Sequence, residues 1–270
     1  MNQDRDLPCP LHQPPLPTDH FLSLVLPAHN EEGNLEWVVR EALAALPQAF
    51  RTSEIIVVDD GSTDGTPAIA ARLAAENLRV RVIRHPQNRG YGAALRSGFA
   101  AARGDRIMFM DSDRQFNIRE VTRLAPLCER YDIVAGYRLK RRDPLRRVAL
   151  GASFNLLVRL LFGVRVRDID CGFKVFRADL LRTLDLQAPG ALINTEILAL
   201  AQRRHATIVE VGVNHYPRPV GEQSGGSPRV VLRALGETLR LWQRLRANAP
   251  TAPTERAARP ATTEPQEQTR

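Results

Sequence analysis

The strongest constraint on the fold is an apolar strand, a polar loop and a helix, repeated three times before a fourth strand. The predicted strands cover Phe21–Pro27, Glu54–Val58 and Val80–Arg84, and the fourth ends at Asp111. The first of the intervening helices shows apolar residues at helical spacing: Leu35, Val38, Val39, Ala42, Leu43 and Leu46. Strands joined by helical crossovers run parallel. The sequence therefore predicts an α/β fold, a mostly parallel sheet with helices on both faces.

Polar residues follow each predicted strand at its carboxyl end. They occupy the segments 28–34, 59–66 and 85–90, and the run Met110-Asp111-Ser112-Asp113-Arg114-Gln115 follows the fourth strand. In open parallel sheets, ligands bind outside the carboxyl ends of the strands. The four polar segments are therefore expected to form one site.

Asp111 and Asp113 are the most informative pair in these segments. Residues i and i+2 of an extended segment point the same way, so both carboxylates can face one ligand. Clustered carboxylates repel unless a cation lies between them, and hard oxygen ligands suit Mg²⁺ or Mn²⁺. The alternative for an isolated Asp-x-Asp is a capped turn with solvated aspartates. The repeated placement of polar segments at strand ends in the rest of the chain favours the metal site.

The composition fits a globular protein of one large α/β domain or two small ones, with 270 residues of which 43% are hydrophobic. No apolar run is long enough to cross a membrane, and the N-terminus lacks the pattern of a signal peptide. The Pro-rich segment 1–20 and the polar tail 247–270 are expected to be disordered, leaving a domain at 21–246. Three scattered cysteines suit a reducing cytosol.

The net charge of +8 suggests an anionic partner: nucleic acid, a membrane surface or a phosphate-bearing substrate. Part of the positive charge is concentrated between Arg138 and Arg147. Binding to nucleic acid usually interleaves such charge with aromatic side chains, and only Tyr137 is near. We therefore expect no nucleic-acid partner.

Taken together, four motifs resemble those of glycosyltransferase family 2. They are Leu26–Glu32, Val57–Asp64, Asn88–Gly90 and Asp111–Asp113, in the family's order. The resemblance covers Phe21–Arg246 and is nearest to the polyprenyl-phosphate sugar transferases, the dolichol-phosphate mannosyltransferase-like branch. It implies the Rossmann-like GT-A fold and inverting transfer from a nucleotide-diphosphate sugar.

The resemblance also implies roles for individual residues. The nucleotide-sugar donor is expected to contact Pro27, His29, Glu31, Val58, Asp60, Asp111, Ser112, Asp113, Arg138 and Arg218. The expected metal ligands, for Mg²⁺ or Mn²⁺, are Asp111, Asp113 and Gln115. Asp113 and Arg138 are the expected catalytic residues, because the cation site and a guanidinium would neutralise the leaving diphosphate.

The acceptor implied by this branch is a polyprenyl phosphate at the cytoplasmic face of the membrane, reached by a peripheral protein. The phosphate is already anionic, so positioning matters more than a general base. The predicted amphipathic helix Leu145–Phe162, with arginines near both ends, would lie on the anionic membrane surface.

Two other functions remain open. A hydroxyl acceptor, such as a glycan or a small phosphorylated acid, would need a base, for which Glu196 is the candidate; the alternative for Glu196 is a capping carboxylate. The chain could also be a nucleotide-binding module without catalysis.

The sequence departs from the family at two places. The segment 221–225 lacks the lysine of the family's Gly-Glu-Ser-Lys loop. Residues 151–153 lack the arginine that many members of the family have in the corresponding helix. Arg146, Arg147 and Arg229 are the candidate substitutes.

Overall fold

The computed structural model describes residues 16–139, 145–220 and 228–247, with side chains at 16–139, 153–220 and 235–247. The predicted disorder of the N-terminal segment, up to residue 15, and of the tail from residue 248 lies outside the described residues. So do the departures at 221–225, while the side chains of Arg146, Arg147 and Arg229 are likewise not described.

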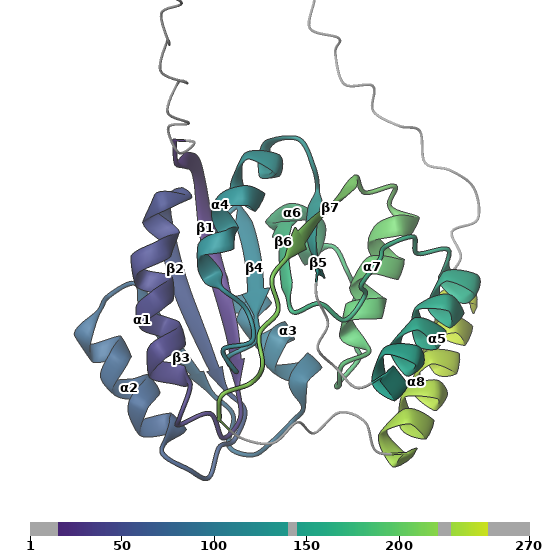
Figure 1. Ribbon diagram of the computed structural model, residues 1–270, viewed down its shortest axis with the longest axis horizontal. Coiled ribbons are helices and arrows are strands. Elements are labelled where there is room, and N and C mark those ends of the chain that lie inside the picture. The colour runs from purple at the N-terminus through teal and green to yellow at the C-terminus, as the bar shows by residue number, and fades with distance from the viewer. Residues whose placement is uncertain (1–15, 140–144, 221–227, 248–270) are drawn as a thin grey trace, which may run out of the picture.

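A single seven-stranded sheet runs through the described part of the chain in the order β3-β2-β1-β4-β6-β5-β7 (Figure 1). The strands are β1 (Thr18–Ala28), β2 (Phe50–Asp59), β3 (Val80–Arg84), β4 (Arg106–Met110), β5 (Ile133–Arg138), β6 (Phe173–Arg177) and β7 (Ile208–Val213). Of these strands, β6 runs antiparallel to its neighbours β4 and β5, and the other pairings are parallel. The predicted mostly parallel α/β fold is confirmed.

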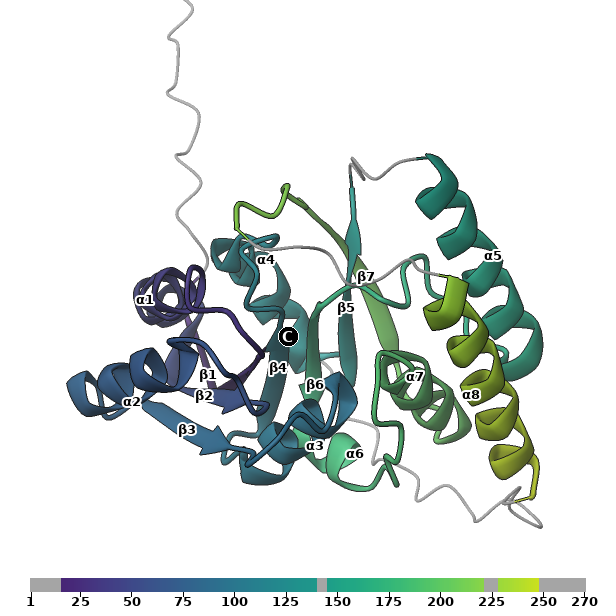
Figure 2. The ribbon, with the colours of Figure 1, turned by 90° about the horizontal axis from the view of Figure 1, so that it is seen from below.

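Helices cover both faces of the sheet (Figures 1 and 2). On one face lie α1 (Leu35–Ala45), α2 (Thr66–Glu76), α4 (Val121–Leu124) and the short 3₁₀ helices η1 (Leu46–Gln48), η2 (Ile118–Glu120) and η3 (Ala125–Glu129). On the other face lie α3 (Tyr91–Ala101), α6 (Ala178–Arg182) and α7 (Ile193–Arg203), and beyond α7 the pair α5 (Leu145–Phe162) and α8 (Pro228–Ala247). Each face has its own hydrophobic core.

The central strands are buried on both faces because they alternate between these two cores. In β1, Leu24 and Leu26 pack toward α1, whereas Val25 packs toward α3, and all three are fully buried. Each such side chain contributes about 1.5–3 kcal/mol by leaving water. On the α3 face, Phe109 stacks on Phe176 with ring centroids 5.9 Å apart.

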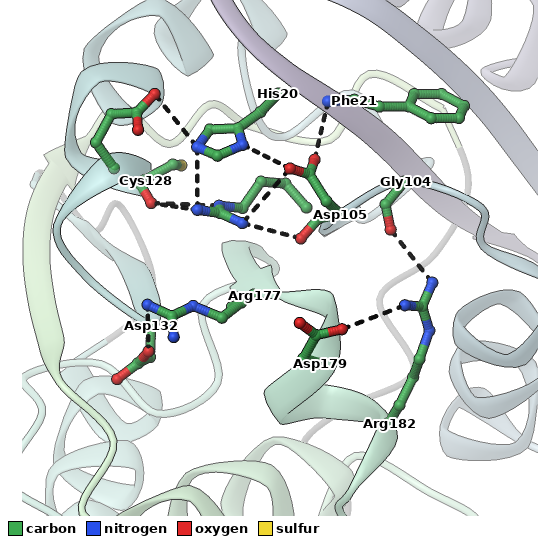
Figure 3. Close-up of polar contacts among 11 residues, drawn as sticks. His20, Phe21, Gly104, Asp105, Cys128, Asp132, Arg177, Asp179 and Arg182 are labelled. Atoms are coloured by element: carbon green, nitrogen blue, oxygen red, sulfur yellow. Dashed lines mark hydrogen bonds and ion pairs between the residues drawn. The ribbon is translucent and has the colours of Figure 1, made fainter. Parts of the chain in front are cut away.

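The first strand begins at Thr18, three residues before its predicted start. Its first residues are polar, so no apolar pattern marks them; they are held by contacts with residues far along the chain (Figure 3). Asp105 accepts the backbone N–H of Phe21 at 2.9 Å and lies 2.6 Å from Nδ1 of His20. Arg106 donates to Cys128 O at 2.8 Å and reaches His20 Nε2 at 3.0 Å.

The sequence did not predict β6, a short strand that continues directly into α6. It pairs Phe173 with Met110 of β4 and Lys174 with Ala135 of β5. Because β6 is antiparallel, it begins where β4 and β5 end. The residues just before Phe173 therefore reach the carboxyl edge of the sheet.

Gly98 allows α3 to approach the sheet closely, since a Cβ there would overlap Val25 Cγ1 and lie 3.2 Å from Val58 Cγ2. We expect Gly98→Ala to lower the free energy of unfolding by about 1–3 kcal/mol through overpacking, despite alanine's helix preference of about 1 kcal/mol. The matched control is Gly236→Ala in α8, where nothing lies within 4 Å of the added Cβ and a small gain is expected. Urea denaturation of both variants measures this, and an unchanged Gly98→Ala midpoint would contradict the close packing.

Candidate functional site

The loops after β1 and β4 meet the loop after β7 at the carboxyl edge of the sheet, the edge that faces the viewer in Figure 2. Ser112 joins the loop after β4 to the end of β1, because its hydroxyl donates to Pro27 O at 2.8 Å. Arg114 has a φ of 63°, a left-handed conformation that turns the chain sharply after Asp113. The backbone N–H of Gln115 then donates to Asp113 Oδ1 at 3.1 Å. The structure thus brings these predicted residues together.

Asp111 is held from two sides. The hydroxyl of Tyr91, at the start of α3, donates to its Oδ1 at 2.8 Å. On the other side lies Gly172, where a Cβ would overlap Asp111 Oδ2. Burial and the nearby Asp113 carboxylate raise the pKa of Asp111 to about 7. The charged form of Asp111 is therefore disfavoured until a cation arrives.

Arg218, after β7, partly neutralises the acidic groups. Its Nη2 lies 2.8 Å from Glu31 Oε1, and its Nη1 lies 3.8 Å from Asp113 Oδ2. The other oxygen of Glu31 accepts from Asn34 Nδ2 at 2.8 Å. Burial raises the pKa of Asp113, and the Arg218 guanidinium opposes that rise. Glu31 and Arg218 are thus paired with each other beside the predicted metal site.

The two aspartates suit a divalent cation shared with a phosphate-bearing ligand. Among the described residues, no group of three or more His, Cys, Asp or Glu side chains is placed to hold a metal. Mg²⁺ sites commonly combine one or two carboxylates with substrate phosphates and water. Asp111 and Asp113, with their raised pKa values, fit that pattern. Gln115 lies on the same turn, and its amide nitrogen donates to Tyr216 O at 3.2 Å.

Asp60 ties β2 to the loop that carries Asn88-Arg89-Gly90. Its Oδ1 accepts from His85 Nδ1 at 2.6 Å and from the Arg89 N–H at 2.9 Å, and its Oδ2 accepts the Gly90 N–H at 2.8 Å. The exposed ring of His29 lies beside it, with Nδ1 2.9 Å from Asp60 O. The Asp60 carboxylate thus orders the loop before α3 and Tyr91.

Val58 is placed differently from its predicted role. Its side chain is fully buried in the core beneath α3 and offers no surface to a nucleotide. The alternation of β2 explains this placement, because neighbouring residues of a strand face opposite sides of the sheet.

Arg138 is the last residue of β5, and its guanidinium is already engaged. Its Nε and Nη2 each lie 2.6 Å from one oxygen of Asp168, a bidentate pair. Although burial opposes it, this pair lowers the pKa of Asp168. A phosphate would therefore meet the remaining edge of the Arg138 guanidinium rather than the fork used by Asp168.

Glu196 does not fit the predicted role of general base. It is fully buried and accepts the backbone N–H groups of Gln187, at 3.0 Å, and of Ala188, at 2.7 Å. It also forms an ion pair with Arg244 of α8. With both oxygens engaged, Glu196 supports the loop before α7. It is not a helix cap either, because α7 has no side-chain cap and the N–H groups that Glu196 accepts lie outside the helix.

Sequence reasoning missed three residues of the site: Tyr91, Asp168 and Lys174. Lys174 is 1% exposed, and its Nζ donates to Ile169 O at 2.9 Å and to Cys171 O. Burial lowers the pKa of Lys174, against the attraction of nearby acidic groups. A charged residue inside the apolar run Phe173–Phe176 is the signal that could have identified it.

Comparison with known proteins agrees with this site. Residues 23–185 match the family described as Glycosyl transferase family 2. The chain is 31% identical over 225 residues to a dolichyl-phosphate beta-glucosyltransferase of Saccharomyces cerevisiae, covering 72% of this chain and 66% of the relative. It is 34% identical over 216 residues to an undecaprenyl-phosphate 4-deoxy-4-formamido-L-arabinose transferase of Pseudomonas syringae, covering 78% of this chain and 62% of that relative. The chain thus spans less than two thirds of either relative's length.

A solved structure shows the same fold. Glucosyl-3-phosphoglycerate synthase from Mycobacterium tuberculosis, in complex with Mn²⁺, uridine diphosphate and phosphoglyceric acid, matches with a TM-score of 0.62 and 27% identity, over 83% of this chain and 78% of that one. The chain belongs to glycosyltransferase family 2, and the predicted family is confirmed. The relatives named for dolichyl and undecaprenyl phosphate support the predicted branch.

The raised pKa of Asp111 predicts pH-dependent binding of a divalent cation. Below pH 7 a proton must leave Asp111 first, so Mn²⁺ affinity should fall about tenfold per pH unit and level off above pH 7. In the metal-free protein, native Asp111 retains a proton that the unfolded state releases, so the contribution of Asp111 to the free energy of unfolding should fall as pH rises from about 4 to 7. Calorimetric titration with Mn²⁺ measures the affinity. Asp111→Asn should bind weakly without this pH dependence, and a flat wild-type profile would contradict the assignment.

Proposed function

We propose that the protein is a metal-dependent inverting glycosyltransferase that moves a sugar from a nucleotide-diphosphate sugar to a polyprenyl phosphate. The observation that carries the proposal is the pair Asp111 and Asp113 at the end of β4, with Arg218 3.8 Å from Asp113 and Arg138 at the end of β5. Carboxylates for a cation beside guanidinium groups are what a departing diphosphate requires. The names of the relatives, which include dolichyl phosphate and undecaprenyl phosphate, support a polyprenyl phosphate as the acceptor.

Each residue has a defined part in this reaction. Asp111 and Asp113, with Gln115 nearby, would hold Mg²⁺ or Mn²⁺, which when bound neutralises charge on the diphosphate as a Lewis acid. The free edge of the Arg138 guanidinium adds fixed donors for the leaving phosphate. Pro27 at the end of β1, His29 just after β1 and Asp60 just after β2 would face the nucleotide. Tyr91 fixes the orientation of Asp111.

The state of Glu196 favours a phosphate over a hydroxyl as the acceptor. A hydroxyl needs a base to take its proton, and Glu196, the candidate for that task, is buried with both oxygens bound. A phosphate monoester is already anionic and attacks the anomeric carbon without losing a proton first. Positioning of donor and acceptor is then the main requirement.

A transfer assay with extracted product tests this proposal. The protein is incubated with labelled nucleotide sugars, Mn²⁺ and undecaprenyl phosphate, and we expect a lipid-extractable product that mild acid releases. Asp113→Asn should lower turnover by about 10²-fold or more, because one charge leaves the cation site without a change of shape. Chelation should act in the same way. Product on a soluble hydroxyl acceptor instead would favour the alternative acceptor, and full turnover with chelator would contradict the metal.

We further propose that the protein works at the cytoplasmic face of the membrane as a peripheral protein. No helix within the described residues is long and apolar enough to cross a bilayer. Leu156 and Leu160 of α5 are 55% and 74% exposed, and Leu235 and Leu239 of α8 are 43% and 50% exposed. Each pair is spaced by four residues and so lies on one face of its helix. Phe162, at the end of the predicted amphipathic helix, is not part of this exposed surface, because it packs toward the core.

Liposome sedimentation tests the membrane proposal. Exposed leucines beside arginines such as Arg159 suit an anionic interface. We expect binding to phosphatidylglycerol vesicles at low salt, release at high salt, and loss of binding in the double variant Leu156→Gln, Leu160→Gln. The matched control is Leu78→Gln, a 98% exposed leucine between α2 and β3. Equal binding by both variants would remove α5 from the proposed surface.

A further inference from the structure

Lys174 is a buried cation that the proposed chemistry does not use. It lies in β6, where it pairs in register with Phe109 of β4, two residues before Asp111. Its side chain is 1% exposed, and its Nζ lies 5.6 Å from the centroid of the Phe109 ring. A buried ammonium is costly unless hydrogen bonds compensate it, so its contacts indicate what it does.

Those contacts go to a single loop, residues 168–172, which we call the β6 loop. The Nζ of Lys174 donates to Ile169 O at 2.9 Å and to Cys171 O. One ammonium nitrogen therefore joins two backbone carbonyls of the same loop, as a clamp from within the sheet. Backbone carbonyls that are bound in this way fix the course of the loop.

The residue type supports a geometric role. Of the 38 basic residues Lys and Arg in the chain, only Lys140 and Lys174 are lysines. Arginine spreads its donors over a planar fork, whereas an ammonium directs several hydrogen bonds from one point. Two carbonyls that converge on one nitrogen in a buried strand are suited to the ammonium.

Both ends of the β6 loop touch groups of the proposed diphosphate site. At one end, Asp168 holds Arg138 through two contacts of 2.6 Å. At the other end, Gly172 lies so close to Asp111 that a Cβ would overlap its Oδ2. A displacement of the loop would therefore move Arg138 and release Asp111 at the same time.

We propose that Lys174 is a positioning residue that clamps the β6 loop and so sets Arg138 and Asp111 at the spacing that one diphosphate requires. The proposal rests on the proposed function for the identity of that ligand. The clamp itself is a property of the fold and can be measured without substrate. Lys174 acts through Asp168 and Gly172 and does not touch the diphosphate.

Hydrogen exchange of the substrate-free protein tests the clamp. In Lys174→Met, amides of the β6 loop should exchange at least about tenfold faster than in the wild type, since local protection is lost. The matched control is Arg106→Met, which removes another buried cation that donates to a backbone carbonyl, Cys128 O, at the opposite end of the sheet. Arg106→Met should leave the β6 loop unchanged. If Lys174→Met does not fold, Lys174→Gln, whose shorter side chain keeps an amide NH₂ but no charge, takes its place.

Turnover measurements separate positioning from general destabilisation. Lys174→Met should lower kcat by about 10²-fold, the scale of a reacting group displaced by about 1 Å, with a small change in KM. In an Arg138→Lys background the same change should cost less, because the part of its effect that passes through Arg138 is already lost and only the part through Asp111 remains. Unchanged exchange of the β6 loop, or kcat losses that simply multiply, would overturn the proposal. If the wild type transfers no sugar, the proposed function fails while the exchange result still decides the clamp.

Discussion

The site depends on keeping three carboxylates close together at one end of a sheet. Glu31, Asp111 and Asp113 repel one another, and burial adds to the cost of their charges. The protein offsets this cost with groups from distant parts of the chain: Arg218 contacts Glu31 and approaches Asp113, and the Tyr91 hydroxyl binds Asp111. The raised pKa of Asp111 shows that the compensation is incomplete. Carboxylates whose negative charge is only partly compensated are suited to binding a divalent cation.

The reversed strand β6 makes this arrangement possible. Parallel strands bring only their carboxyl ends to the ligand-binding edge, so a sheet without β6 would place there only the residues that follow strands. Because β6 runs the other way, its amino end and the loop before it reach the same edge. That loop supplies Asp168 to Arg138 and places Gly172 against Asp111. Gly172 of this loop and the Tyr91 hydroxyl thus lie on two sides of Asp111.

The sequence was sufficient for the features that depend on local patterns. Apolar spacing from Leu35 located α1, and the predicted helix Leu145–Phe162 has the bounds of α5. The polar segments at the strand ends located Asp111 and Asp113. It was insufficient where long-range contacts decide. Arg138 and Glu196 are engaged by Asp168 and Arg244, partners 30 and 48 residues away in the sequence. The apolar periodicity of a helix or strand does not indicate contacts between residues so far apart in the sequence. The short strand β6, which continues directly into a helix, was missed for the same reason: neighbouring strands stabilise it, rather than its own pattern.

The contact of Arg218 with Glu31 and its approach to Asp113 have a consequence for turnover. Since a guanidinium already lies 3.8 Å from Asp113, binding of a divalent ion and a diphosphate in the proposed reaction would exchange one counter-ion of the carboxylates for another. Exchange weakens capture, because each incoming charge displaces part of an existing attraction. In the proposed reaction it would also ease departure, since the contacts of Arg218 with Glu31 and Asp113 would form again as the nucleoside diphosphate leaves. The ligand-free protein thus already holds the ion pairs that would form again after the product leaves.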